Sequence, residues 1–226
     1  MSEEFKKIFQ TSSYAEQARE VVRHMILTGV YGPGERLKEM EISQSLGISR
    51  SPVREAVQGL ANEGLVKIVP QKGAFVASFN QREVEELCEV REALETMTVR
   101  LAADRATDSE MEELKDLLEA IKATLDSNEA ANYPRDLDFH KKVAELTQNR
   151  KLTKKVAEVT SQLGLVRLRS AASPGRAVQA YEEHVAIFEA LRRRDSEEAA
   201  EAMRRHIHNV RANVLDILTI DSRGAA

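Results

Sequence analysis

Four side chains in the C-terminal half of the sequence have the types and spacing of a divalent-metal site. Asp136 and His140 are four residues apart in a predicted helix, so their side chains project from one face. His184 and His206 stand eleven residues before and eleven after Asp195, where a turn between two helices is predicted. At about 1.5 Å rise per residue, both lie roughly 16 Å from that turn, at one level of an antiparallel helix pair. Imidazoles together with a carboxylate suit Zn, Ni, Mn or Fe.

Apolar neighbours predict that the two histidines beside this turn face the interior. They are Ile187 and Leu191 on the face of His184, and Ala199, Ala202 and Met203 near the face of His206. Each histidine taken singly is more commonly a buried, hydrogen-bonded side chain than a metal ligand. Two histidines at one level, together with an Asp-x-x-x-His pair elsewhere in the chain, favour a metal site. The residues alone nevertheless leave open whether these histidines bind a metal or are simply buried and hydrogen-bonded.

A second set of side chains, in the N-terminal part, has the character of a helix that contacts DNA. Arg50 and Arg54 share one face near the start of a predicted helix, and Ser49 and Ser51 flank the first of them. The core-facing stripe of this helix is Val53, Ala56, Val57 and Leu60. Such a helix is anchored by its apolar stripe, while its N-terminal end offers arginines to guanine and backbone N–H groups to phosphate. The alternative is a small helical module with solvated arginines.

The elements around these arginines have the order of a winged helix-turn-helix. Helices are predicted at about 13–28, 38–46 and 49–63, and each is followed by a glycine, a common helix stop. Two short β-branched or apolar runs follow at 65–69 and 74–77, and residues 70–73 join them as a hairpin tip. Lys72 at this tip would reach a neighbouring phosphate or the minor groove. Residues 1–78 are therefore predicted to form a DNA-binding domain.

Residues 79–226 are predicted to form an all-α bundle, so the fold as a whole is mainly α. No glycine occurs between Gly73 and Gly164, and this stretch is rich in Glu, Leu, Ala and Lys, which favour helices. Apolar residues recur at spacings of three and four, which gives each helix one buried face. About six helices are expected, at roughly 81–104, 108–127, 131–147, 150–171, 176–193 and 195–220.

Composition excludes some classes of protein and leaves DNA binding open. The 226 residues contain no apolar run long enough to span a membrane, no secretory signal and one cysteine, Cys88, which fits a cytoplasmic protein. The net charge of −4 is unlike that of a typical basic DNA binder. Residues 1–78, however, hold ten Lys or Arg against nine Asp or Glu, while the remainder holds 23 against 28. The total charge therefore does not identify the partner.

The N-terminal sequence resembles the GntR family of bacterial transcription regulators. The resemblance covers about sixty residues and rests on the segments 29–37 (GVYGPGERL), 46–56 (LGISRSPVREA) and 63–66 (EGLV), with Leu60 between the last two. It implies a homodimer whose recognition helices enter the major groove of a palindromic double-stranded DNA operator. The implied DNA contacts are Ser49, Arg50, Ser51 and Arg54 on the helix, and Lys72 and Gly73 on the wing. Met40 stands where some relatives have Arg, so no contact is implied there.

The C-terminal sequence resembles the FCD ligand-binding domain of the FadR-type branch of these regulators. The resemblance rests on 136–140 (DLDFH), Asn149, 183–184 (EH) and the segment 190–206. It implies a divalent metal held by Asp136, His140, His184 and His206, which in turn helps to hold a small carboxylic-acid effector. Arg91 is a candidate for a second contact to that acid; the alternative is an exposed helical Arg paired with Glu95 four residues on.

Together these features predict a transcription regulator, a repressor whose operator affinity is controlled by the effector through a linker at about 77–82. One alternative is a metal-dependent enzyme, since three histidines and an aspartate can also activate water. No general base of the H-E-x-x-H kind accompanies the ligands, and Glu183 and Asp138 are predicted to point away from the metal, so an enzyme is not expected. The other alternative is a purely structural metal site in a protein with a DNA-binding appendage.

Overall fold

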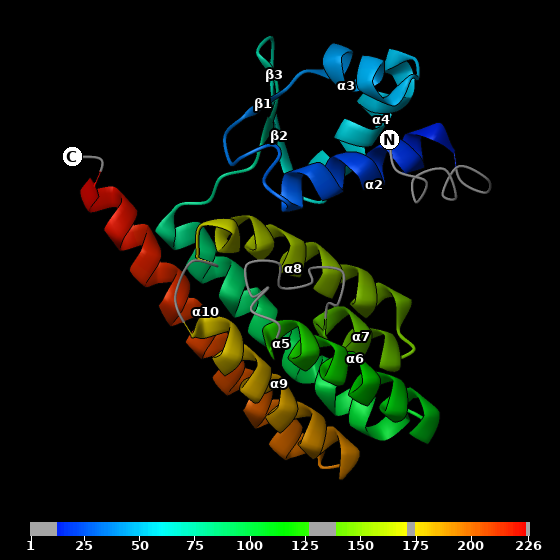
Figure 1. The fold of residues 1–226 in the computed structure, drawn as a ribbon, viewed down its shortest axis with the longest axis vertical. Coiled ribbons are helices and arrows are strands. Elements are labelled where there is room, and N and C mark those ends of the chain that lie inside the picture. The colour runs from blue at the N-terminus through cyan, green and yellow to red at the C-terminus, as the bar shows by residue number, and fades with distance from the viewer. Residues whose placement is uncertain (1–12, 127–138, 171–174, 225–226) are drawn as a thin grey trace. The chain divides into compact units, whose positions relative to one another are not determined.

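The computed structural model describes residues 13–126, 139–170 and 175–224 (Figure 1). The chain divides into two compact units with a boundary between Ser78 and Phe79, and residues 164–168 of helix α8 are grouped with the first unit. No helix in the described part of the chain is both long enough and apolar enough to span a bilayer.

The first unit contains three helices, α2 (Tyr14–Leu27), α3 (Glu39–Leu46) and α4 (Arg50–Asn62). Ser13 is the N-cap of helix α2, and its hydroxyl accepts a hydrogen bond from the backbone N–H of Glu16. Gly47 follows helix α3 as its C-cap, and its φ of 67°, a conformation that favours glycine, turns the chain toward α4. The predicted apolar stripe of α4 is confirmed, since Val53, Ala56, Val57 and Leu60 are all buried.

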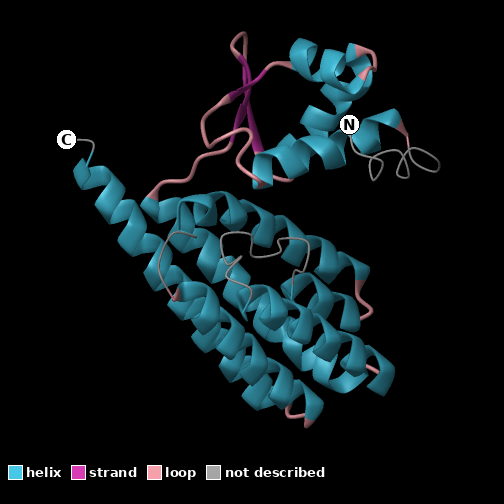
Figure 2. Cartoon of the chain, viewed as in Figure 1, coloured by secondary structure: helices cyan, strands magenta, loops and turns pink. Residues whose placement is uncertain are grey.

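A three-stranded antiparallel sheet completes the first unit (Figure 2). Its strands are β1 (Arg36–Leu37), β2 (Val66–Val69) and β3 (Gly73–Val76), in the spatial order β1-β3-β2. The β2–β3 hairpin lies within a residue of its predicted position, with Val69 opposite Gly73. Strand β1 was not predicted, because two residues are too short to show the alternation that marks a strand.

The second unit is an all-α bundle, as predicted. Its described helices are α5 (Gln81–Arg105), α6 (Asp108–Asp126), α7 (Phe139–Leu146), α8 (Arg150–Ser170), α9 (Arg176–Arg192) and α10 (Ser196–Gly224). Local capping sets several of the starts: Asn80 forms a capping box with Glu83, and Asp195 accepts from the backbone N–H of Glu198. The third predicted helix, 131–147, is described only from Phe139 onward, since residues 127–138 lie outside the described part.

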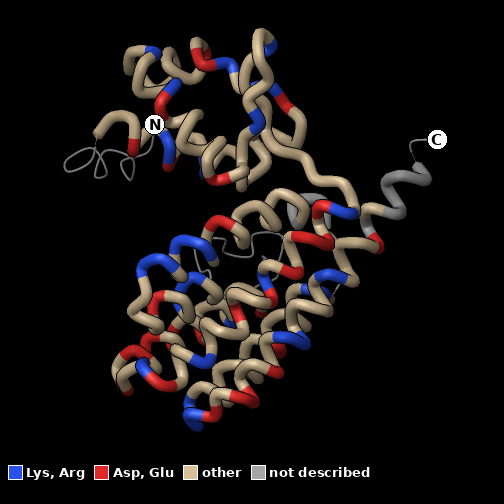
Figure 3. The backbone as a smooth tube through the Cα atoms, turned by 180° about the vertical axis from the view of Figure 1, so that it is seen from behind, with Lys and Arg blue, Asp and Glu red and all other residues tan. Residues whose placement is uncertain are grey.

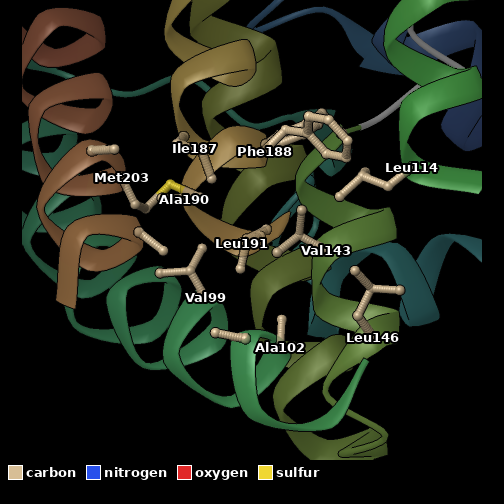
Figure 4. Close-up of a cluster of buried hydrophobic side chains, with 14 of the residues drawn as sticks. Val99, Ala102, Leu114, Val143, Leu146, Ile187, Phe188, Ala190, Leu191 and Met203 are labelled. Atoms are coloured by element: carbon tan, nitrogen blue, oxygen red, sulfur yellow. The ribbon is translucent and has the colours of Figure 1, made fainter. Parts of the chain in front are cut away.

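The core of the second unit is built from apolar side chains of α5, α6, α7, α9 and α10 (Figure 4). Helix α5 runs along α10, and α9 packs against α10 as an antiparallel neighbour (Figure 1). Charged residues of both signs are interspersed along the helices of this unit (Figure 3). Among the described residues, the side chains of Arg91, Glu95, His140, His184 and His206 are nevertheless buried inside it.

Candidate functional site

Three buried histidines from different helices meet inside the bundle. His140 comes from α7, His184 from α9 and His206 from α10, and their ring centroids are 4.8 to 5.0 Å apart. One nitrogen of each ring lies within 4.8 Å of the other two, a grouping that could hold a metal ion. The Nε2 atoms of His140 and His184 are 3.3 Å apart. Two imidazole nitrogens on a tetrahedral ion, each about 2.0–2.1 Å from it, are separated by roughly the same distance.

Two carboxylates orient two of these imidazoles by accepting hydrogen bonds from their Nδ1 atoms. Glu95 accepts a hydrogen bond from Nδ1 of His140, and Glu183 accepts one from Nδ1 of His206 at 2.6 Å. A proton on Nδ1 leaves the lone pair on Nε2, which is the nitrogen that faces the cluster. The ring of His184 is held differently, by stacking on Phe139 with centroids 4.4 Å apart and planes 14° from parallel. These contacts fix the rings in an arrangement that suits a shared cation.

Arg91 adds a buried positive charge to the same cluster. Its side chain is only 1% exposed, which contradicts the alternative of an exposed helical arginine, although the expected ion pair with Glu95 is present. Its Nη2 lies over the ring of His140, 2.8 Å from Nε2 and 3.3 Å from Nδ1, and is 3.5 Å from Nε2 of His206. Its Nη1 is buried and has no hydrogen-bond partner among the described residues. A buried donor without a partner destabilises a protein, so an anion that accepts a hydrogen bond from this Nη1 would bind favourably here.

The structure brings together three of the four predicted metal ligands. His184 and His206 lie together, as their equal spacing from Asp195 predicts, and His140 meets them from α7. Asp136, the fourth predicted ligand, lies outside the described residues, as does Asp138. The cluster is thus defined by its imidazoles and by the groups that contact them.

Sequence reasoning missed the orienting roles of Glu95 and Glu183. Glu183 points away from the metal-facing nitrogens, as predicted. It nevertheless contacts a predicted ligand, because it accepts a hydrogen bond from Nδ1 of His206. It also accepts from Arg176 at 2.9 Å and from Asn209 at 2.8 Å. The only sequence signals were the spacing of Glu95 from Arg91 and the position of Glu183 beside His184.

The predicted DNA-contacting residues of α4 all lie at its exposed N-terminal end. Ser49 is the N-cap residue in extended conformation and its side chain makes no capping hydrogen bond. Ser49, Arg50 and Ser51 are exposed, and the Arg54 side chain is 69% exposed with its Nε 3.4 Å from a Glu39 carboxylate oxygen. Hydroxyls and guanidinium groups are therefore available on one surface beside a helix N-terminus, where anions bind favourably.

The predicted wing residues lie at the tip of the β2–β3 hairpin. Lys72 is exposed in the turn, and Gly73 begins β3 with a φ of 107°, a conformation that favours glycine. A Cβ at Gly73 would lie 3.3 Å from the guanidinium of Arg36. Arg36 thus adds an exposed cation to the wing, which sequence reasoning missed because β1 was not predicted. Met40, where no contact was implied, is exposed on α3.

Comparison with known proteins matches both units to one class of regulator. Residues 14–76 match the family "Bacterial regulatory proteins, gntR family", and residues 86–209 match the FCD domain. The chain is 30% identical over 205 residues to the HTH-type transcriptional regulator YdhC of Bacillus subtilis (strain 168), covering 90% of this chain and 92% of that protein. It is 26% identical over 208 residues to the HTH-type transcriptional repressor RspR of Escherichia coli (strain K12), covering 92% and 91%.

The fold agrees with these relationships. The solved structure of E. coli McbR/YncC superposes with a TM-score of 0.79 at 23% identity, covering 90% of this chain and 98% of that one. The matched families and relatives are transcription regulators and not enzymes, which argues against the metal-dependent enzyme considered above. The chain therefore belongs to the GntR family of bacterial regulatory proteins and carries an FCD domain after its helix-turn-helix unit.

Proposed function

We propose that this chain is a cytoplasmic transcription repressor that binds a palindromic operator as a homodimer, under the control of a small carboxylic acid held at a divalent metal. In this proposal residues 1–78 bind DNA, and residues 79–226 bind the metal and the acid and form the dimer. The observation that carries the proposal is the convergence of three buried imidazoles on one point of the bundle. That the relative RspR is named a repressor supports repression over activation.

The donor set suits a divalent metal such as Zn, Ni, Mn or Fe. His140, His184 and His206 would bind it through Nε2, with Asp136 as a fourth ligand, while Glu95 and Glu183 keep two of the rings oriented. When bound, the metal supplies open coordination positions that a carboxylate oxygen can fill. The chain's own contribution is to hold the rings in place through Glu95, Glu183 and Phe139.

An organic acid is the ligand that best fits the charges of the cluster. A divalent cation together with Arg91 would carry more positive charge than Glu95 and Asp136 neutralise. The buried Nη1 of Arg91 is a donor that a carboxylate can use. A purely structural metal site, by contrast, is usually closed by four protein ligands and needs no such donor. Arg91 therefore favours effector binding over a structural role.

The exposed end of α4 supports specific DNA recognition. Arg50 and Arg54 would contact base edges, and the hydroxyls of Ser49 and Ser51 would contact phosphates. At the wing, Lys72 would contact phosphate, and Gly73 lets the backbone approach the DNA closely. Residues 77–82 would transmit a change in the bundle to the two recognition helices. Such coupling requires that the effector bind the two arrangements of the dimer with different affinities.

The test begins with identification of the ligands. Metal analysis and mass spectrometry of the purified chain would give the metal and any retained acid, and selection from a random duplex library would give the operator. Fluorescence anisotropy then measures operator affinity with and without saturating acid. We expect the acid to weaken operator binding by at least about tenfold. Unchanged affinity for every acid that binds the metal site would contradict effector control.

A variant with Arg50 and Arg54 both changed to Ala is the matched control for the measurement of operator binding. It should retain metal and acid and lose the selected operator, since both residues lie in the unit that lacks the histidine cluster.

A further inference from the structure

Arg91 holds a cation against the imidazole nitrogens that a metal ion would bind. Its Nη2 lies 2.8 Å from Nε2 and 3.3 Å from Nδ1 of His140, and 3.5 Å from Nε2 of His206. Because Nη2 is close to both ring nitrogens of His140, it lies over the face of that ring and not along the in-plane lone pair of Nε2. The Nδ1 proton of His140 is directed to Glu95, so the lone pair that a metal would use is on Nε2. A metal bound there at about 2.0–2.1 Å would lie within a few ångströms of the guanidinium, so the two cations compete for this part of the cluster.

Electrostatics reinforces this competition. A guanidinium does not lose its proton in proteins, so Arg91 stays charged when a metal approaches. Its exposed fraction is 1%, and a buried setting screens repulsion between two cations far less than water does. Glu95 carries a single negative charge, which already faces Arg91 and His140, and Glu183 is paired with Arg176. The site therefore opposes metal binding as long as Arg91 remains against the histidines.

An anion can remove this opposition. A carboxylate that accepts from Arg91 would draw Nη2 away from His140, and Nη1 is a second donor that has no partner among the described residues. The other carboxylate oxygen can then bind the metal, so the negative charge lies between the two cations. We infer that Arg91 makes metal binding and carboxylate binding depend on each other, each raising the affinity for the other. This inference rests on the function proposed above.

The reciprocity has a thermodynamic consequence. If a carboxylate raises metal affinity by some factor, the metal must raise carboxylate affinity by the same factor. Arg91 would thus act as a positioning and charge-coupling residue and not only as the ion-pair partner of Glu95. A merely structural Arg91 predicts that its removal weakens metal binding or leaves it unchanged, whether or not an anion is present.

The test measures Zn²⁺ affinity of the full chain by competition with a chromophoric chelator, after metal removal. Acetate is the probe because it is the smallest carboxylate that can bridge a metal and a guanidinium, and chloride at equal ionic strength is the reference. For the wild-type chain we expect acetate to tighten Zn²⁺ binding at least about fivefold. For Arg91→Met we expect binding in chloride at least about fivefold tighter than wild type, with less than about a twofold effect of acetate.

Arg100→Met is the matched control, since Arg100 lies on the same helix and pairs with Glu197 at the surface, and it should behave as wild type. Arg91→Lys keeps the cation and should keep the acetate effect. If Arg91→Met fails to fold, the double variant Arg91→Met, Glu95→Gln is compared with Glu95→Gln alone, so that the loss of the Glu95 contact with His140 is the same in both chains.

The possible results distinguish failure of the inference about Arg91 from failure of the proposed metal-dependent function. Equal Zn²⁺ affinities for wild type and Arg91→Met in chloride, with equal acetate effects, would overturn the inference while leaving the metal site intact. A wild-type chain that binds no Zn²⁺, Ni²⁺, Mn²⁺ or Fe²⁺ in either buffer would overturn both the inference and the proposed metal-dependent function.

Discussion

Glu183 on α9 accepts a hydrogen bond from Nδ1 of His206 on α10 at 2.6 Å. The same carboxylate accepts from Arg176 and Asn209, so three neighbours hold it in place. Its contact lies on the far side of the imidazole from Nε2, the nitrogen that faces the cluster. Glu183 therefore determines which nitrogen of His206 is available to a ligand.

Removing this carboxylate should weaken metal binding without removing a ligand. We expect Glu183→Ala to lower Zn²⁺ affinity by about 10- to 100-fold, the usual effect of losing a group that orients a metal-binding histidine. Chelator competition measures the change. Glu182→Ala, at the exposed neighbouring position, is the matched control. Equal affinities in the two variants would show that His206 does not need Glu183.

Loss of one clustered histidine should abolish metal retention. We expect His184→Ala to purify with little metal and to lose the rise in unfolding temperature that added metal gives the wild type. Binding at 100 times the dissociation constant stabilises a folded chain by about 2.7 kcal/mol. His208→Ala is the control, because His208 is exposed and pairs with Glu92 at 3.0 Å. Mass spectrometry of the metal content and thermal melts provide the readings.

Substitutions at the N-terminal end of α4 should reduce sequence discrimination. We expect Arg50→Ala and Arg54→Ala each to cost about 1–3 kcal/mol of operator binding and to relax preference at particular base pairs. Arg82→Ala is a suitable control, since Arg82 is an exposed arginine paired with Glu86 on α5. Anisotropy titrations with operator and scrambled duplexes separate the two effects. A uniform loss on both duplexes would instead assign these arginines to phosphate contacts.

The start of α6 should contribute a pH-dependent stability. Hydrogen bonds from the backbone N–H and then the hydroxyl of Thr107 lower the pKa of Glu110 below its ordinary value. A lowered folded-state pKa stabilises the chain above the unfolded pKa of about 4.3, and this stabilisation is lost as pH falls through the folded value. Glu110→Gln should therefore melt below wild type at pH 7.5, and the difference should shrink at pH 3.5. Glu112→Gln, at an exposed position of α6, should show no such change in the difference.

The helices could be predicted closely because their boundaries are set by neighbouring residues. Gly47 after α3, Asn80 before α5 and Asp195 before α10 act within one turn of their own helix. Strand β1 could not be predicted in this way, since it is defined by pairing with a strand almost forty residues later. Local signals therefore account for most of the fold and for little of the sheet edge.

In the candidate site, too, the features set by local spacing could be predicted and the others could not. The meeting of His184 and His206 follows from counting residues on either side of a turn, and this prediction is confirmed. The contacts of Glu95 with His140 and of Glu183 with His206 depend on how each helix is rotated about its axis. The complete burial of Arg91 depends on the same rotation. Spacing along one helix does not determine that rotation, so these features required the structure.

The described part of helix α7, Phe139–Leu146, has a buried face that includes both His140 and Phe139, the ring that stacks on His184. Most of the stability of a helix in a protein comes from packing of its apolar face, so the conformation of this segment depends on the burial of that face. A ligand that binds the three histidines binds only the docked form of α7, and it must therefore suppress local unfolding of this segment. Amide hydrogen exchange in α7 is consequently a direct measure of site occupancy, independent of DNA.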